Sequence, residues 1–558
     1  MRVRFFLSAL VVLFAFAALA QAVPGSSSPV TISVVGTSDL HGHIAALPWL
    51  AGYLKNLRAA RARTGGAVIL LDAGDMLQGT LESNLQEGAP VIRAYNALGY
   101  TAVAVGNHEF DFGPAGPAPS PVNPGDDPRG ALKARAAQAH FPFLAANILD
   151  HATGKPVAWP HVQPSTIINA AGIRIGIVGV VTAATPHSSL PANVAGLDFL
   201  PLAPIIAREA CKLRARGATV VIAVAHEGGA CRSFADPDKL DSCDAGSEIF
   251  SIVRALPRGS VDAVVAGHTH QALAQRVAFV PIIQAYADGR AFGRVDLIVE
   301  RSTGKVLASH LEAPHDICPA STPETCRPTD YEDGRVQIDK EVQELIAPAF
   351  VQAWRKGDED LGAKVLRPLL HNRKQETALG NLLADLMRAS RPGSDVAMIN
   401  GGGMRADLPA GRLNLGHLYE TFPFDNAFAS LRASAGEFRG LLARSLSRSG
   451  SMVSLSGVRV HARCKGDNLE VVLTRPNGTP LRDDEILAIT TTDFLATGGD
   501  GFFAGVKLPF EIGTPLRDGL AEALRARGGI LDPGDRTLFD PLHPRFDLPG
   551  EVPIRCSP

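Results

Sequence analysis

Short runs of small, apolar and β-branched residues alternate with helix-like stretches from Val30 to about Leu311. Runs of this length and composition favour buried strands. Most of them continue directly into polar residues, as in VTISVVGTSD, AVILLDAGD, TAVAVGNHE, RIGIVGVVT, TVVIAVAHE and VDAVVAGHTH. The alternation predicts an α/β domain, and strand ends are where such domains commonly place their chemistry.

A second α/β pattern begins at about Leu361, and its motifs differ from those of the first half. Between the halves lies RVQIDKEVQELIAPAFVQAWRKG, in which apolar residues recur near helical spacing until Gly357. A chain of 558 residues is also too long for one ordinary core. We therefore expect a first domain at 30–330, a linker helix at 331–360 and a second domain at 361–556.

The N-terminus has the pattern of an export signal. Arg2 and Arg4 precede or open the apolar run FFLSALVVLFAFAALA, and Ala20-Gln21-Ala22 has the small residues of a cleavage site. The run is shorter than the roughly 20 apolar residues that a membrane-spanning helix needs. We predict a signal peptide at 1–22 and a periplasmic or secreted protein with no membrane anchor after cleavage.

Export to an oxidising compartment makes the seven cysteines informative. None of their spacings is the CxxC of a zinc site, so we assign no metal to sulfur. Cys211 falls in the helix-like PIIAREACKLRARG, where we expect a buried thiol. For the others we expect the disulfides Cys231–Cys243, Cys318–Cys326 and Cys464–Cys556.

Composition and charge narrow the class of protein. A hydrophobic content of 46% supports globular domains rather than disorder. The formal net charge of −2 gives no electrostatic reason to expect nucleic-acid polymers or anionic membranes as partners. We expect a small-molecule substrate, and the sequence does not fix the oligomeric state.

Carboxylate, amide and imidazole side chains gather at the ends of the predicted strands of the first half. Asp39 and His41 lie two residues apart, as do His268 and His270, which would place each pair on one side of an extended segment. Imidazole and carboxylate ligands favour Zn, Mn, Fe or Co. The complete candidate set is Asp39, His41, Asp75, Asn107, His226, His268 and His270.

This inventory predicts two divalent ions of uncertain identity (Zn, Mn, Co or Fe), with Asp75 between them. One shell would contain Asp39, His41 and His270, and the other Asn107, His226 and His268. Two ions about 4 Å apart can hold a bridging hydroxide and clamp the oxygens of an in-line phosphoryl displacement.

The stretch GNHEFD gives His108 and Asp111 a separate role. His108 adjoins the candidate ligand Asn107 but should point the other way along the chain. Asp111 is close enough in sequence to accept the ring N–H of His108 and keep it protonated. We predict that His108 stabilises charge on the transferring phosphoryl group or on the leaving oxygen.

The ordered motifs DLHGH, GDMLQG, GNHEFD, AHEGG and GHTH resemble those of the calcineurin-like metallophosphoesterases. NGGGMR, FPFDN and DFLATGGDGF in the second half are similar to the C-terminal domain of 5′-nucleotidases. Together the motifs cover nearly all of the mature chain and resemble the bacterial bifunctional UDP-sugar hydrolase/5′-nucleotidase family. The resemblance implies a four-layer αββα sandwich followed by a second α/β, nucleotide-binding domain.

The same resemblance implies substrate contacts in the second domain. Two aromatic rings, Phe424 and Phe494, would sandwich the base, with Asn426 at its edge. Asp500 would accept from the ribose hydroxyls. By the same analogy, the residues that contact phosphate, ribose or the inter-domain substrate are Arg373, Asn400 and Arg405.

The resemblance further implies rotation of the domains about the linker helix, for which Lys356 and Gly357 are hinge candidates. The sequence also departs from the family. Ala378 and Thr497 stand where an Asn is usual, which could reshape the nucleotide contacts.

We therefore expect an exported dimetal phosphohydrolase that converts nucleoside 5′-phosphates to nucleoside and phosphate. Alternatives within the enzyme class are hydrolysis of UDP-sugars or 2′,3′-cyclic nucleotides, and the related thiosulfohydrolases share the two-domain plan. A nucleotide-binding protein with little turnover is an alternative of a different class.

Overall fold

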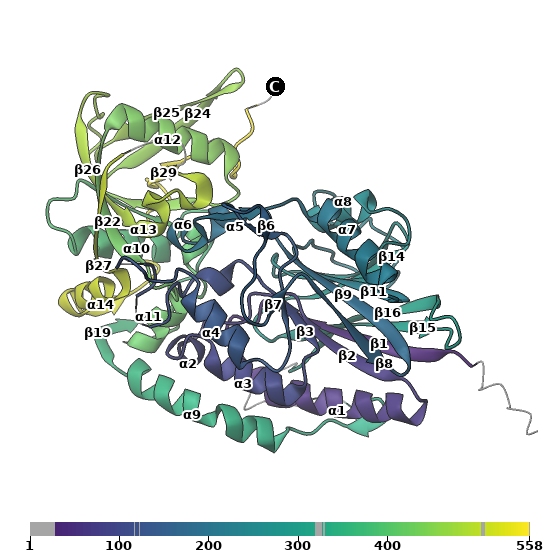
Figure 1. Cartoon of the computed structure of the whole chain (residues 1–558). Helices are drawn as coiled ribbons and strands as arrows, with labels where there is room; N and C mark the ends of the chain where they lie inside the picture. Colours follow the sequence, from purple (N-terminus) through teal and green to yellow (C-terminus); the bar gives the residue numbers. More distant parts are fainter. Residues whose placement is uncertain are drawn as a thin grey trace, which may run out of the picture.

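The computed structural model describes residues 28–116, 118–121, 123–318, 326, 328, 330–503 and 508–556. The predicted signal peptide lies outside these residues. The described chain forms two α/β domains, with helix α9 (Lys340–Gly357) running beneath the first domain toward the second (Figure 1). None of the described helices combines the length and the apolarity needed to cross a bilayer.

Two sheets form the centre of the first domain. The first sheet has the order β16 (Val306–Asp316), β15 (Ala291–Val299), β1 (Val30–Thr37), β2 (Ala67–Asp72), β3 (Ala102–Ala104), β4 (Phe143–Leu144) and β7 (Val162–Gln163). The second has the order β13 (Ala272–Val277), β14 (Val280–Ala285), β12 (Ala263–Ala266), β11 (Val220–His226), β9 (Ile173–Val181) and β8 (Ser165–Ala170). The strands β1, β2 and β3 are parallel, as are β9, β11 and β12, so their carboxyl ends meet at one edge of each sheet.

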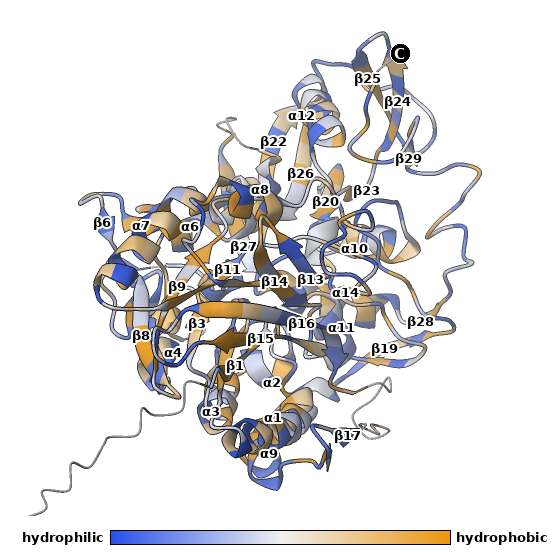
Figure 2. Ribbon diagram, turned by 90° about the vertical axis from the view of Figure 1, so that its right-hand side faces the viewer, coloured by the Kyte–Doolittle hydropathy of each residue, from blue (hydrophilic) through white to orange (hydrophobic). Residues whose placement is uncertain are grey.

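The two sheets pack face to face because both faces of their central strands are apolar. In β11, Val220, Ile222 and Val224 lie in the core between the sheets, whereas the residues that alternate with them face the outer helices. Figure 2 shows the hydrophobic colouring concentrated on these central strands. Near-continuous apolar runs are what a sheet covered on both sides requires.

Helices cover the outer face of each sheet. On the first sheet they are α1 (Leu47–Arg63), α3 (Ala89–Leu98) and α4 (Gly130–Gln138), and the linker helix α9 packs against α1 and α3. On the second sheet they are α7 (Leu202–Ala215) and α8 (Glu248–Ala255). The first domain is therefore a four-layer αββα sandwich, which confirms the expected fold class.

The second domain has a five-stranded sheet with helices on both faces. Its order is β23 (Val453–Ser456), β20 (Val396–Asn400), β26 (Ile486–Thr492), β22 (Ala427–Ser434) and β27 (Phe510–Pro515). One face carries α10 (Ala378–Ala389) and α14 (Leu516–Arg527), and the other carries α12 (Ala435–Arg448). Two small sheets flank it: β21 (Gly411–Asn414), β19 (Asp360–Val365) and β28 (Gly529–Leu531); and β25 (Asn468–Thr474), β24 (Arg459–Lys465) and β29 (Phe546–Asp547).

Helix α9 packs along the first domain and ends against the second. Asp339 caps it by accepting a hydrogen bond from the backbone of Val342. The hinge candidate Gly357 is buried where α9 meets α11 (Leu415–Thr421), and a Cβ there would lie 3.3 Å from the Cα of Gly416. Its φ is not in the left-handed region, so close packing accounts for the glycine in this conformation.

A buried ion-pair network ties α1 to β1 and β15. The Asp296 carboxylate accepts from Arg61 at 2.8 Å, from Ser33 at 2.6 Å and from both ends of the Arg294 fork. Arg294 also donates to Glu332, which precedes the linker helix. The network joins the first sheet to the segment that leads into the linker helix.

All three expected disulfides are present. The prediction for Cys211 is wrong, because its thiol is exposed on α7. The apolar stripe of that helix runs through Ile206, Ala210 and Leu213, and Cys211 lies one position beyond it. A shift of one residue turns a helical side chain by about 100°, from the core toward solvent.

Candidate metal centre and substrate cleft

The candidate ligands sit on tight turns after the strands, with backbone in an unusual conformation. Five of the seven have positive φ: Asp39 (52°), His41 (47°), Asp75 (57°), His268 (74°) and His270 (57°). Residues other than glycine enter this region at an energetic cost and persist only where their surroundings hold them. The expectation that each pair of ligands lies on an extended segment is therefore wrong.

Hydrogen bonds between the turns offset that cost. The backbone N–H of Asp39 donates to the carbonyl of Gly74 at 2.9 Å, and that of His41 donates to the carbonyl of Asp75 at 3.0 Å. The Asp39 carboxylate accepts from the backbone N–H of His268 at 3.0 Å. The turns that carry the candidate ligands are thus hydrogen-bonded to one another, and their side chains converge on one site although the backbone is not extended.

One group contains Asp39, His41 and His270, whose ligand atoms all lie within 4.8 Å of one another. His41 Nε2 lies 3.0 Å from His270 Nε2 and 4.0 Å from Asp75 Oδ2. His270 Nε2 lies 3.7 Å from Asp39 Oδ1. These are the same three residues that the sequence analysis assigns to one of the two ions.

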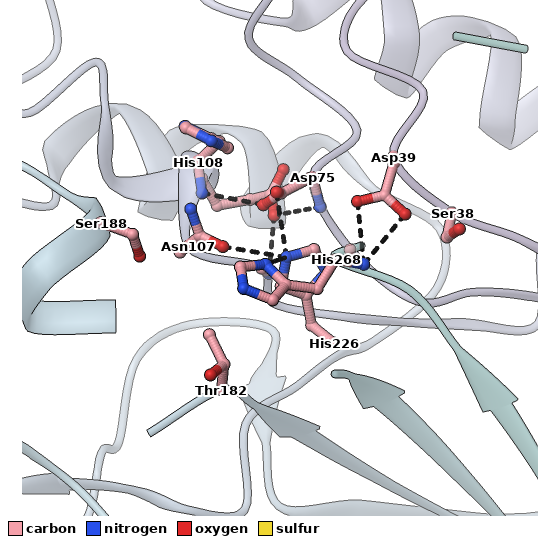
Figure 3. A network of polar contacts seen from close by, with 12 residues as sticks. Ser38, Asp39, Asp75, Asn107, His108, Thr182, Ser188, His226 and His268 are labelled. Atoms are coloured by element: carbon pink, nitrogen blue, oxygen red, sulfur yellow. Dashed lines mark hydrogen bonds and ion pairs between the residues drawn. The ribbon is translucent and has the colours of Figure 1, made fainter. Parts of the chain in front are cut away.

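The second group contains Asp75, His226 and His268 within the same limit. His226 Nε2 lies 2.9 Å from Asp75 Oδ2, 3.0 Å from Asn107 Oδ1 and 3.2 Å from His268 Nδ1. Figure 3 shows the side chains of these four residues pointing toward one another. Asp75 lies between the two groups, which is the position expected of a shared ligand.

The chemistry of the donor set fits cations. The Nδ1 atoms of His41 and His226 lie 2.8 Å and 2.7 Å from the carbonyl oxygens of Gln78 and Ala73, so each Nδ1 must carry the proton. In the neutral rings the Nε2 lone pairs then face other acceptors, such as Asp75 Oδ2 and Asn107 Oδ1. A cation relieves that contact, and imidazoles that ligate metals commonly donate their other nitrogen to a carbonyl.

The electrostatic surroundings keep most of these imidazoles neutral. Burial, followed by the charge of Arg405, holds the pKa of His41 and of His270 well below the usual value. Burial and His226 lower the pKa of His268 to about 3. Neutral imidazole is the form that binds a metal.

At the contact between His226 Nε2 and Asp75 Oδ2, a proton on the imidazole is the alternative to a cation. Burial alone would lower the pKa of His226, but the Asp75 carboxylate outweighs it and raises that pKa to about 10. Burial opposes ionisation of Asp75 as well, yet His226 and His108 hold its pKa well below the usual value. The pair leaves the carboxylate ionised at the centre of the cluster.

His108 and Asp111 lie beside the cluster. His108 Nδ1 is 2.6 Å from Asp111 Oδ2; His108 begins a short 3₁₀ turn, η2 (His108–Phe110), and Asp111 directly follows it. Burial alone would lower the pKa of His108, but Asp111 and Asp75 raise it above its usual value. The turn, rather than strand alternation, directs His108 away from the side on which Asn107 meets His226.

Glu109, which the sequence indicates to be a supporting or solvated residue rather than a catalytic one, supports the site from beneath. The residue is 1% exposed, and its carboxylate accepts from four backbone N–H groups: Asp75 at 2.8 Å, Gly106 at 2.7 Å, Met76 at 2.8 Å and Leu77 at 3.3 Å. The turns after β2 and β3 are thereby fixed to each other. Only the position of Glu109 within GNHEFD hinted at this role.

A cavity of about 180 Å³ lies between the two domains. The first domain contributes candidate ligands, the His108–Asp111 pair and the short helix α5 (Thr185–Ser188) with the residues that follow it. The second domain contributes all seven residues expected to bind substrate: Arg373, Asn400, Arg405, Phe424, Asn426, Phe494 and Asp500. The structure brings the two sets of candidates together in one cleft.

Arg405 and Phe424 lie beside the metal cluster and the His108–Asp111 pair. Arg405 Nη2 lies 3.3 Å from His41 Nε2 and 3.5 Å from His270 Nε2. The Phe424 ring lies 5.5 Å from the His108 ring and 5.8 Å from the Arg405 guanidinium, centre to centre. A positive charge and an aromatic face of the second domain therefore border the candidate metal site directly.

The polar candidates of the second domain are held by neighbours. Asn400 donates to Asp500 Oδ2 at 2.8 Å, which orients that carboxylate. Asn426 donates at 2.9 Å to Asp493, a buried carboxylate that sequence reasoning missed. The departures Ala378 and Thr497 do not line the cavity: Ala378 is buried in the core, and the Thr497 hydroxyl donates to the Asp493 carbonyl.

Comparisons with known proteins agree with this architecture. Residues 32–272 match the calcineurin-like phosphoesterase family, and residues 362–506 match the 5′-nucleotidase C-terminal domain. The crystal structure of a 5′-nucleotidase precursor from Thermus thermophilus superposes with a TM-score of 0.72 at 23% identity, covering 93% of this chain and 99% of that one. The likeness in fold therefore extends over both domains.

Two curated relatives are similar in sequence. A 5′-nucleotidase of Vibrio cholerae is 26% identical over 553 residues, covering 91% of this chain and 92% of the relative. The endonuclease YhcR of Bacillus subtilis is 26% identical over 464 residues, which are 83% of this chain but 35% of that longer protein. The chain belongs to the calcineurin-like, metal-dependent phosphoesterases that carry a 5′-nucleotidase C-terminal domain.

Proposed function

We propose that the protein is an exported 5′-nucleotidase that hydrolyses nucleoside 5′-phosphates to nucleoside and inorganic phosphate. The observation that carries this proposal is the shared lining of one cavity. Candidate metal ligands face it from one side, and two phenylalanines, two arginines and a carboxylate face it from the other. That combination suits a ligand with a planar base, a diol and a phosphate.

Two divalent cations would be held by the two groups of ligands described above, with Asp75 shared and Asn107 completing the second group. When bound, such ions supply Lewis acidity and an activated water for phosphoryl displacement. Zn, Mn, Co and Fe all accept this mixture of imidazole, carboxylate and amide ligands.

The protein's own residues would orient the ester and move a proton. Arg405 would hold phosphate oxygens at the mouth of the first group, where its guanidinium already lies. His108, kept protonated by Asp111, would donate from its ring to the leaving 5′-oxygen as the phosphorus–oxygen bond breaks. Water supplies the oxygen that remains on phosphate and the proton that restores His108.

Phe424 and Phe494 would bind the base, and Asp500 would accept hydrogen bonds from the ribose hydroxyls. The resemblance to 5′-nucleotidases in the second domain supports this assignment. UDP-sugars and 2′,3′-cyclic nucleotides present the same base and ribose, so they are the competing substrates to be tested.

Export is part of the proposal. Three disulfides are typical of proteins that fold in an oxidising compartment. The apolar, Arg-flanked segment at 1–22 has the pattern of a signal peptide.

The test is a substrate panel with defined metals. Purified protein is stripped with a chelator, reloaded with Mn²⁺, Zn²⁺ or Co²⁺, and assayed with mononucleotides, UDP-glucose and 2′,3′-cyclic nucleotides. We expect metal-dependent phosphate release with mononucleotides as the preferred substrates. Preference for UDP-glucose or a cyclic nucleotide would replace the proposed substrate, and nucleotide binding without turnover would overturn the enzymatic proposal.

A further inference from the structure

The loop Phe422–Asp425, which carries the Phe424 ring, is held by its backbone from two directions. On one side, Arg517 of α14 donates to the carbonyl of Phe422 at 3.2 Å, to the carbonyl of Phe424 at 2.8 Å and to Asp425 Oδ1 at 2.8 Å. The Arg517 guanidinium also lies 3.7 Å from the centre of the Tyr419 ring. All of these groups belong to the second domain.

The carbonyl between those two is bound by the first domain instead. Pro423 O accepts from Gln78 Nε2 at 3.0 Å and from Asn84 Nδ2 at 3.3 Å. All three residues are buried, with Gln78 2% and Asn84 8% exposed. Proline has no N–H, so its carbonyl is the one backbone group through which this residue can be held.

Gln78 contacts the metal cluster as well. Its main-chain carbonyl lies 2.8 Å from His41 Nδ1 and fixes the tautomer of that candidate ligand. Its side chain spans the domain boundary to Pro423, one residue before Phe424. Gln78 therefore contacts both the candidate metal ligand His41 and the loop that carries Phe424.

We propose that Gln78 and Asn84 are positioning residues that clasp Pro423 across the domain boundary and so fix the Phe424 ring over the candidate metal site. The proposal rests on the function proposed above. While the clasp is made, Phe424 stays beside His108 and Arg405, in place to bind a base. Without it, Arg517 and the core of the second domain still hold the loop, but its place relative to the metal cluster is set only by the remaining contacts between the domains.

The chain offers clean variants for a test. Gln78→Met keeps the length of the side chain and the backbone carbonyl that serves His41, and it removes the donor to Pro423. Among the described residues, Gln78 Oε1 has no hydrogen-bond partner, so its loss breaks no other bond. Gln352→Met on α9 is the matched control, because that glutamine is exposed and bonds only Gln86 in the described chain.

We expect Gln78→Met to raise KM for a mononucleotide about 3- to 10-fold, the scale of one buried hydrogen bond. Its kcat for a small generic phosphodiester and its metal content should match the wild type within about twofold, and Gln352→Met should change none of these quantities. An unchanged KM would overturn the clasp. An equal loss on both substrates, or a loss of metal, would instead assign Gln78 a role in the metal site alone.

A second measurement does not depend on turnover. The exposed Cys211 of the first domain and a cysteine introduced at the exposed Ile486 of the second provide a pair of labelling sites. We expect pulsed electron paramagnetic resonance to show a broader distribution of interdomain distances for Gln78→Met than for wild type. Identical distributions would contradict the clasp even if no nucleotide proved to be a substrate, which separates its failure from failure of the proposed function.

Discussion

His108 Nδ1 and Asp111 Oδ2 lie 2.6 Å apart, while the backbone N–H of His108 donates to Asp75 Oδ1 at 2.8 Å. His108 therefore contacts the metal cluster through its backbone N–H, whereas its ring bonds to Asp111, which is not a candidate ligand. This separation makes the ring removable without removing a ligand.

We expect His108→Ala to lower kcat by roughly 10²–10⁴-fold, the usual contribution of an acid–base group. Metal content, measured by elemental analysis, should differ from the wild-type value by no more than about 20%, since the backbone contact to Asp75 persists. Asp111→Asn should give a smaller loss of kcat. Full activity of His108→Ala would refute the proton-donor role.

Phe424→Ala should act on binding rather than on the chemical step. Loss of a stacking ring costs about 1–3 kcal/mol, so KM for nucleotides should rise about 10-fold or more. Activity on a small generic phosphodiester should be spared. Phe279→Ala is the control, because that ring is 78% exposed in the turn between β13 and β14, and an equal loss on both substrates would contradict the stacking role.

Removal of the metals should lower both activity and stability. Several ligand residues adopt positive φ, and bound cations stabilise the folded state that holds them there. Treatment with a chelator should abolish turnover and reduce the midpoint of thermal unfolding, and Mn²⁺ or Zn²⁺ should restore both. Asp75→Asn should show a much smaller gain from added metal; a gain equal to that of wild type would argue against a shared ligand.

Glu109→Gln should destabilise the first domain although it replaces none of the candidate metal ligands. The amide nitrogen of glutamine would face backbone N–H groups that now donate to a carboxylate oxygen, at a cost of about 2–3 kcal/mol. Denaturant unfolding measures the change. Glu344→Gln, at an exposed position of α9, should be neutral, and equal stability of the two variants would show that the four N–H contacts contribute little.

The stability contributed by Asp296 should depend on pH. Burial alone would raise the pKa of Asp296, but hydrogen bonds from Arg294 and Ser33 lower it below its usual value. A carboxyl group with a lowered pKa in the folded state stabilises the protein above its unfolded pKa of about 4, and that contribution is lost as the pH falls through the folded pKa.

Asp296→Asn should therefore cost about 2–4 kcal/mol of unfolding free energy at pH 7, because it leaves Arg294 partly unpaired in a buried site. The deficit relative to wild type should shrink as the pH approaches 3. A deficit that is constant over this range would mean that the ionised carboxylate is not its source.

Much of the fold could be predicted from local patterns. Uninterrupted apolar runs such as Val220–His226 indicate strands buried on both faces, and parallel strands bring their polar ends to one edge. That is why the ligand groups around Asp39 and Asp75 follow from the sequence. The error at Cys211 arose because helical phase decides exposure there, and the helix boundary fixes that phase only in the structure.

Other parts of the site depend on contacts that no local pattern contains. Glu109 became a buried acceptor because two separate turns direct their N–H groups at it. Gln78 and Pro423 are 345 positions apart and meet only when both domains are in place. The left-handed turns at Asp39 and His41 are held by bonds between loops, whereas spacing alone indicated extended chain.

Those left-handed turns determine how this centre could be transplanted. Copying seven side chains onto the strand ends of another scaffold would aim them wrongly, because Asp39 and His41 take their directions from left-handed backbone that an ordinary extended strand does not have. A graft would have to carry whole turns together with Gly74 and Glu109, which brace them. What must be transferred is the backbone conformation of these turns, because the ligand residues alone do not determine it.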